Sequence, residues 1–279
     1  MNKDIVIGII GGTGAMGQWF KHFFEKQGYK VLIAGRTTEL TPVELAKRCD
    51  VVIISVPISS TVEAIKQIAP HVKKEALLTD FTSLKSEPVK AMLQYSKSEV
   101  IGCHPVFGPT VKSLKKQTIV LCPARGKVWL PWLKSLFEKN EAFVKVSTPE
   151  EHDKAIAIVQ SLRHYTELAF ASSMRELKVN LKETLEFTSP VYWLRIITMG
   201  RLLAQDPKLY ADIEIMNPDS LKVIDAYIKS LKAIRKIVAD KDMDAFIKLF
   251  NDNADYFSEF KARFMEESDY LIDKLVVKK

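Results

Sequence analysis

Residues 5–17 read IVIGIIGGTGAMG, an apolar run followed by glycines 12, 14 and 17 in the spacing GxGxxG. In a strand–turn–helix unit, these glycines make the tight turn, let backbone N–H groups approach a pyrophosphate and allow the helix to pack closely on the sheet. The N-terminus of the helix adds the positive end of its dipole. The motif in this context predicts a dinucleotide-binding loop. The residues expected to contact the cofactor are Gly12, Thr13, Gly14, Ala15 and Met16.

The chain around this loop alternates short apolar runs with helical patterns as far as residue 148. Such alternation predicts an α/β domain with a mostly parallel sheet covered on both faces. The expected strands are Ile5–Ile10, Lys30–Ala34, Val51–Ser55, Ala76–Thr79, Val100–Gly102, Ile119–Cys122 and Phe143–Val146. The expected helices are Ala15–Gln27, Pro42–Cys49, Ser60–Ala69, Glu87–Gln94 and Val128–Glu138.

The pattern changes at Thr148-Pro149-Glu150-Glu151, which has the form of a capped helix start. Further helix starts are expected at Ser189-Pro190 and Asp206-Pro207, and no strand is expected after residue 148. From Asp219 onward the apolar spacing predicts two long amphipathic helices. We therefore expect a Rossmann-type domain over residues 1–148 and an all-α domain over 149–279. The apolar faces of the last helices predict a homodimer.

The residues after the second expected strand bear on the choice between NAD and NADP. An acidic residue at that strand end binds the ribose 2′-hydroxyl of NAD, whereas an arginine accommodates the 2′-phosphate of NADP. Here the strand is followed by Gly35, Arg36 and Thr37, with no carboxylate before Glu39. NADP is therefore favoured over NAD. The third strand end is expected to lie near the nicotinamide and contributes Ser55, Val56 and Pro57.

Composition limits the classes of function. The net charge is +7, but lysine and arginine are interspersed with acidic residues, which argues against nucleic-acid binding. No apolar run reaches the length of a membrane span, and the N-terminus has no signal-peptide pattern. Three widely spaced cysteines favour a reducing compartment, so a cytoplasmic protein is expected. No cysteine or histidine spacing predicts a metal site.

The stretch IGCHPVFGPT (residues 101–110) places His104 where a strand is expected to end in a rigid loop. A polar residue at such a position is well placed for catalysis, and Ser83 follows the neighbouring strand. A Cys103–His104 nucleophile pair is disfavoured, because adjacent residues of an extended segment point to opposite faces. A catalytic base and a merely packed histidine both remain open from the residues alone.

The sequence resembles the prephenate dehydrogenase family, in particular the dehydrogenase portion of the bifunctional chorismate mutase–prephenate dehydrogenases. The resemblance spans nearly the whole chain. It is carried by DFTSLKSEP (80–88), GCHPVFGP (102–109), EHDKAIAIVQSLRHY (151–165) and SPVYWLRIITMGRLLAQDPKLYADI (189–213).

This resemblance implies oxidative decarboxylation of prephenate to 4-hydroxyphenylpyruvate, with hydride transfer to NAD(P)+. It implies that His104 accepts the proton of the substrate's 4-hydroxyl group and that Ser83 orients His104. Arg201 would bind the ring carboxylate, and His164 would line the substrate site. Further site-lining positions would be Lys85, Gln205 and Tyr210.

Three other functions remain as alternatives. An arogenate dehydrogenase would act on a substrate with an amine in place of the keto group. A second alternative is a different NADP-dependent oxidoreductase of the same two-domain build. A nucleotide-sensing protein without activity is disfavoured, because both His104 and Arg201 are present.

Overall fold

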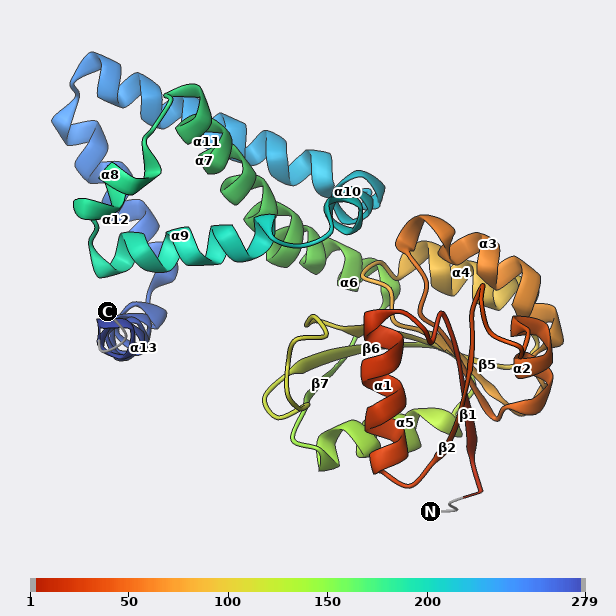
Figure 1. The fold of residues 1–279 in the computed structure, drawn as a ribbon. Helices are drawn as coiled ribbons and strands as arrows, with labels where there is room; N and C mark the ends of the chain where they lie inside the picture. Colours follow the sequence, from red (N-terminus) through yellow and green to blue (C-terminus); the bar gives the residue numbers. More distant parts are fainter. Residues whose placement is uncertain (1–3, 277–279) are drawn as a thin grey trace. The chain divides into compact units, whose positions relative to one another are not determined.

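The computed structural model describes residues 4–276, which form two compact units (Figure 1). The sheet unit comprises the described residues up to Val159 together with Lys208–Asp219. The helical unit comprises Gln160–Pro207 and the described residues from Ser220 onward.

Seven strands form one sheet in the order β2-β1-β3-β4-β5-β6-β7. Strands β1 to β5 are parallel, β6 is antiparallel to β5, and β7 is parallel to β6. The strand order reverses between β1 and β3, and ligands of open α/β sheets bind at such a switch point. The strands are β1 (Val6–Ile10), β2 (Lys30–Ala34), β3 (Val51–Ile54), β4 (Leu77–Asp80), β5 (Glu99–Pro105), β6 (Thr118–Arg125) and β7 (Phe143–Val146).

Both faces of the sheet are buried, as expected for parallel strands in an α/β protein. One face packs an aromatic cluster from α1 (Ala15–Lys26) and α5 (Trp129–Lys139). The other face packs aliphatic residues from α2 (Pro42–Arg48), α3 (Ile58–Ile68) and α4 (Ser86–Tyr95). Successive residues of β3 alternate between the two clusters, which explains why that strand is apolar at every position. The short 3₁₀ helix η1 (Ala69–His71) follows α3.

Every strand and helix expected before residue 148 is present, with ends that differ by a few residues at most. The expected α/β class with a parallel sheet and a helical C-terminal part is therefore confirmed. The main difference is at β5, which continues to Pro105 and pairs His104 with Val120 of β6. His104 therefore belongs to a strand and not to the loop that the sequence predicts.

After residue 148 the described chain contains only helices and turns, as expected. The elements are α6 (Pro149–Ile156), the π-helix η2 (Ala157–Leu162), α7 (Arg163–Glu176), α8 (Leu181–Glu186), α9 (Pro190–Leu203), α10 (Pro207–Met216), α11 (Ser220–Asp240), α12 (Met243–Phe257) and α13 (Phe260–Val276). The C-terminal segment thus forms three helices and not two. The chain leaves helical geometry at Lys241 and Ser258, both at positive φ.

The boundary between the two compact units does not lie at residue 148. Helix α6 belongs to the sheet unit, where the Asp153 carboxylate accepts hydrogen bonds from the backbone N–H groups of Lys85 and Ser86. Helix α10 also belongs to it, with Asp212 accepting from the N–H and hydroxyl of Ser59. The compact units describe packing alone. The expected domains 1–148 and 149–279 therefore stay a prediction.

Candidate active site

The glycine-rich loop lies at the switch point between β1 and β3. Gly11 has a φ of +81°, and a Cβ atom there would collide with the carbonyl oxygen of Ser55. A Cβ on Gly17 would lie 2.6 Å from the Gly11 carbonyl oxygen. These positions need glycine because the loop, the third strand end and the first turn of α1 are pressed together.

The N-terminus of α1 is open to an anion. Gly14 is the N-cap residue and offers no side-chain hydrogen bond, and the first turn contains no acidic residue. By contrast, α2 and α6 each begin with a complete capping box. The unfilled N–H groups and the dipole of α1 fit a pyrophosphate, so the residues present here fit a dinucleotide.

The turn after β2 exposes Arg36 and Thr37. In the described part of the chain, Arg36 makes no ion pair or side-chain hydrogen bond. The hydroxyl of Thr38 is occupied, because it accepts from the Gly35 N–H at 2.8 Å and lies 2.8 Å from the Leu40 carbonyl oxygen. Arg36 and Thr37 are therefore the residues of this turn whose side chains are available to bind a substituent on the ribose of a dinucleotide cofactor.

His104 is only 2% exposed and lies at the carboxyl end of β5. Burial lowers the pKa of His104 well below its usual value, and the nearby His152 and Lys85 lower it further. His104 is neutral at physiological pH, which is the form that a base requires.

Cys103 lies on the opposite face of β5, in the aromatic cluster with α1 and α5. Burial holds the pKa of its thiol well above the usual value. A protonated thiol on the other face cannot act as a nucleophile together with His104.

Lys85, which the resemblance implies as a site-lining residue, is fully buried in the described structure. Its ammonium forms an ion pair with Asp80 and donates to the Cys103 carbonyl at 3.0 Å. Asp80 in turn accepts from the backbone N–H groups of Thr82 and Cys103. This network ties the end of β4 to β5, so Lys85 supports the strand that carries His104.

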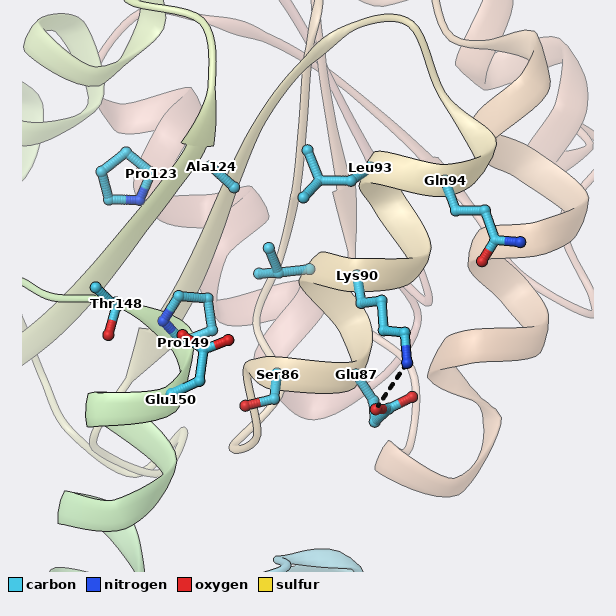
Figure 2. Close-up of a pocket in the computed structure, with 11 residues that line it drawn as sticks. Ser86, Glu87, Lys90, Leu93, Gln94, Pro123, Ala124, Thr148, Pro149 and Glu150 are labelled. Atoms are coloured by element: carbon cyan, nitrogen blue, oxygen red, sulfur yellow. Dashed lines mark ion pairs between the residues drawn. The ribbon is translucent and has the colours of Figure 1, made fainter.

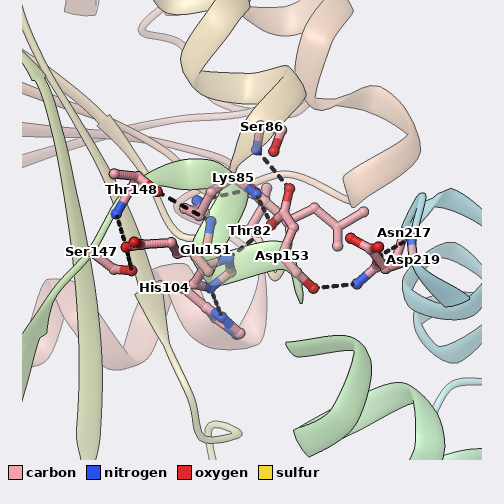
Figure 3. Close-up of polar contacts among 12 residues, drawn as sticks. Thr82, Lys85, Ser86, His104, Ser147, Thr148, Glu151, Asp153, Asn217 and Asp219 are labelled. Carbon is pink, nitrogen blue, oxygen red and sulfur yellow. Dashed lines mark hydrogen bonds and ion pairs between the residues drawn. The ribbon is translucent and has the colours of Figure 1, made fainter. Parts of the chain in front are cut away.

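His152 and Asp153 were not predicted as site residues, although both stand in the motif EHDKAIAIVQSLRHY (151–165). His152 Nε2 lies 2.8 Å from His104 Nδ1, and His152 Nδ1 lies 2.8 Å from Asp153 Oδ1. Figure 3 shows His104 and Asp153 among the polar contacts that join α6 to its neighbours. The adjacent histidine and carboxylate just after the capped start of α6 were the available sequence signal.

Ser83 lies half-buried in the loop after β4. Within residues 4–276 the hydrogen-bond partner of His104 is His152, and none is formed with Ser83. The orienting role expected for Ser83 stays a prediction.

The other expected substrate residues are distributed over both units. Arg201 and Gln205 are exposed at the C-terminal end of α9, and Gln205 donates to the Arg201 carbonyl at 3.1 Å. His164 is buried in α7 of the same helical unit. Tyr210 is half-buried on α10, which belongs to the sheet unit.

A surface hollow of the sheet unit lies between α4, β6 and the start of α6 (Figure 2). Its lining includes the exposed ion pair of Glu87 and Lys90, with Leu93 and Pro123 nearby. None of the predicted catalytic or cofactor-binding residues lines it. This hollow is therefore separate from the candidate active site.

No helix in residues 4–276 is long and apolar enough to cross a membrane. Within the same residues, no group of three or more histidine, cysteine, aspartate or glutamate side chains is arranged to hold a metal ion.

Solved structures with the same fold include an arogenate dehydrogenase from Synechocystis, with a TM-score of 0.72 and 19% identity over 90% of this chain and 99% of that one. A second is the prephenate dehydrogenase of Aquifex aeolicus in complex with hydroxyphenyl propionate and NAD+. It has a TM-score of 0.72 and 21% identity over 94% of this chain and 98% of that one. At these identities the likeness concerns the fold alone.

Sequence comparison identifies nearer relatives. A Methanocaldococcus jannaschii protein named "Probable arogenate/prephenate dehydrogenase" is 36% identical over 96% of this chain, which spans 64% of that relative's length. The T-protein of Haemophilus influenzae is 33% identical over 98% of this chain and 73% of its own length. Residues 27–146 match the model of the prephenate dehydrogenase nucleotide-binding domain, and residues 148–252 match that of its dimerization domain. The chain therefore belongs to the prephenate dehydrogenase family.

Proposed function

We propose that the protein is an NAD(P)-dependent prephenate dehydrogenase that converts prephenate to 4-hydroxyphenylpyruvate and CO2. The observation that carries this proposal is the buried, neutral His104 at a strand end in the same unit as the glycine-rich loop. Membership of the family and the names of its relatives support the choice of substrate class.

In this reaction His104 takes the proton of the substrate's 4-hydroxyl group as the hydride leaves C4. The nicotinamide, when bound, supplies the hydride acceptor. The ring carboxylate then leaves as CO2, and its bonding electrons complete the aromatic ring. Because the product carries a phenol hydroxyl, the proton held by His104 returns to that oxygen, and the base is regenerated.

The cofactor would be held by residues of the sheet unit. The N–H groups of Ala15 and Met16 at the uncapped start of α1 suit the pyrophosphate. The exposed Arg36 suits the 2′-phosphate of NADP, which favours NADP over NAD. Gly12, Thr13, Gly14, Gly35 and Thr37 would line this site with Ser55, Val56 and Pro57 of the neighbouring strand end.

On the substrate side, Arg201 is proposed to bind the ring carboxylate through its planar guanidinium group. His164, Gln205 and Tyr210 are proposed to line the site, and Ser83 to orient His104 once substrate is bound. Lys85 has no part in this proposal because its ammonium is buried and paired.

The test is to mix the purified protein with prephenate or arogenate and with NAD+ or NADP+, and to follow the absorbance of the reduced cofactor. We expect turnover to be fastest with prephenate and NADP+. If arogenate is the better substrate, the alternative named in the M. jannaschii relative replaces the proposal. Absence of turnover with all four pairs would reject a dehydrogenase function.

We further propose a homodimer formed through the C-terminal helices in the cytoplasm. The match of residues 148–252 to a dimerization domain supports the first part. Cys49, Cys103 and Cys122 are free thiols, which supports a reducing compartment.

A further inference from the structure

Two buried side chains, His152 and Asp153, continue the series of polar contacts that starts at the proposed base, His104. Asp153 contacts His152, and His152 contacts His104, at 2.8 Å in each case. The two imidazole planes meet at 72°, and each of the three residues is 2% exposed. Since water does not reach these contacts freely, the protons between them must be arranged by the protein itself.

The ionisation state of Asp153 determines which atoms of the series donate hydrogen bonds and which accept them. Burial works to raise the pKa of this carboxyl, but hydrogen bonds from His152, Ser86 and Lys85 outweigh it and hold the pKa below its usual value. Asp153 is therefore ionised and can only accept hydrogen bonds. Its oxygens already accept from the backbone N–H groups of Lys85 at 2.8 Å and Ser86 at 2.9 Å, so the carboxylate is held in place (Figure 3).

Because Asp153 only accepts, the proton of the first contact belongs to His152 Nδ1. When His152 carries only this one proton, its Nε2 is unprotonated and accepts a hydrogen bond from His104 Nδ1. His104 Nε2 is consequently left without a proton. Among the described residues His104 has no other hydrogen-bond partner, so this nitrogen is not engaged by the protein.

We propose that His152 and Asp153 are positioning residues that hold His104 in the tautomer protonated at Nδ1, so that Nε2 is the atom that accepts the substrate's hydroxyl proton. The inference deepens the proposed function and rests on it for the identity of the proton donor. It assigns roles to two residues that act through His104 and do not themselves touch the substrate.

The protonated state of His104 that forms during the reaction is short-lived, because burial and the neighbouring His152 and Lys85 all disfavour it. The charged groups around His104 are Lys85 from the start of α4, Asp80 from β4 and Asp153 from α6, and the neighbouring Cys103 is an uncharged thiol. Lys85 and Asp80 form an ion pair, so the cluster carries the one negative charge of Asp153.

The first test reads the tautomer without any substrate. Long-range ¹H–¹⁵N correlation spectra of the full ¹⁵N-labelled chain distinguish protonated from unprotonated ring nitrogens. The His104 signals are assigned by their loss in His104→Asn. We expect Nδ1 of His104 to be protonated and Nε2 to be unprotonated at neutral pH. A proton on Nε2 in the wild-type chain would overturn the proposal.

The second test compares His152→Gln with His71→Gln, since His71 is an exposed histidine of the same unit. We expect His152→Gln to lower kcat at least tenfold, with KM for prephenate changed less than twofold, and His71→Gln to leave both unchanged. A folded His152→Gln protein with wild-type kcat would contradict the inference.

The two tests separate the inference from the proposed function. If the wild-type protein turns over none of the four substrate pairs, the function is rejected, and the tautomer measurement still decides the arrangement of protons. If the wild type is active but His104 carries its proton on Nε2, the function stands and the positioning role is rejected.

Discussion

At the scale of single residues, the chemistry of His104 depends on what burial does to a titratable ring. Removal from water disfavours the imidazolium form, so the ring is neutral at pH 7 and has a free lone pair. The ion pair between Lys85 and Asp80 and the anchored Asp153 supply the fixed charges around it. This combination suits a base that gains a proton for a short time and then returns it.

Replacing His104 by asparagine removes the lone pair with little change in volume. Since a positioned base contributes about 10²- to 10⁴-fold to a rate, we expect His104→Asn to lower kcat at least 100-fold. Cofactor affinity, measured by fluorescence titration with NADPH, should stay within twofold of the wild type. A large loss of cofactor affinity would instead place His104 in the cofactor site.

Arg201→Ala tests the proposed contact with the ring carboxylate. A charge-assisted contact is worth about 1.5–3 kcal/mol, so KM for prephenate should rise roughly 10- to 100-fold. Arg195→Ala is the matched control, because Arg195 is exposed on the same helix and stacks on Phe170 at 4.2 Å. An unchanged KM in Arg201→Ala would remove Arg201 from the substrate site.

Arg36→Asp tests the cofactor preference. An aspartate can bind the ribose 2′-hydroxyl of NAD and repels the 2′-phosphate of NADP, so the ratio of kcat/KM for NAD+ to that for NADP+ should rise at least tenfold. Lys47→Asp provides the same charge change at an exposed position of α2. Equal preference in the variant and the wild type would contradict the role of Arg36.

At the scale of elements, helices that start without a cap differ in role from helices that start with one. An uncapped N-terminus can bind an anion, whereas a capped N-terminus stabilises its helix. Helix α1 begins at Gly14 with no side-chain cap, whereas α6 begins at Thr148 with a complete capping box to Glu151. The uncapped end leaves N–H groups for a phosphate. The capped end fixes the first turn of the helix that carries His152 and Asp153.

Thr148→Ala removes the cap of α6 and should lower the free energy of unfolding by about 1 kcal/mol. Urea unfolding followed by circular dichroism measures this loss. Thr41→Ala, at the capping box of α2, should cost a similar amount. Only the Thr148 variant should also lower kcat, because α2 carries none of the proposed catalytic residues. Equal kcat in the two variants would argue against the coupling of α6 to catalysis.

At the scale of the whole molecule, the C-terminal helices expose more apolar surface than a monomer needs. On α11 the side chains of Ile228, Leu231, Ile234 and Val238 are 39% to 61% exposed at helical spacing. Helix α12 adds Phe250, which is 66% exposed. Contiguous apolar surface of this kind marks an interface, in agreement with the dimerization-domain match of this region.

We expect the protein to be a dimer by multi-angle light scattering. Placing charges on the apolar face with Leu231→Glu together with Phe250→Glu should convert it to a monomer, because buried unpaired carboxylates are costly. Lys232→Glu introduces a glutamate at an exposed polar position of α11 and should leave the dimer intact. A monomeric wild-type protein would reject the proposed homodimer.

The sequence by itself determined the elements of the sheet unit and the site of the phosphate loop. Apolar alternation, helix caps and the spacing of Gly12, Gly14 and Gly17 act over a few residues, so they can be read locally. The three-helix end of the chain was harder to predict, since the breaks at Lys241 and Ser258 carry neither glycine nor proline.

Only the tertiary structure decided the environment of His104. His152 is 48 positions away along the chain, and the Lys85 N–H that anchors Asp153 is 68 positions from it. Such contacts form because β5 continues through His104 and α6 packs on the sheet unit, and no local pattern encodes either fact. The proposed base could therefore be predicted from the sequence, whereas the neighbouring groups that hydrogen-bond to it and surround it with charge could not.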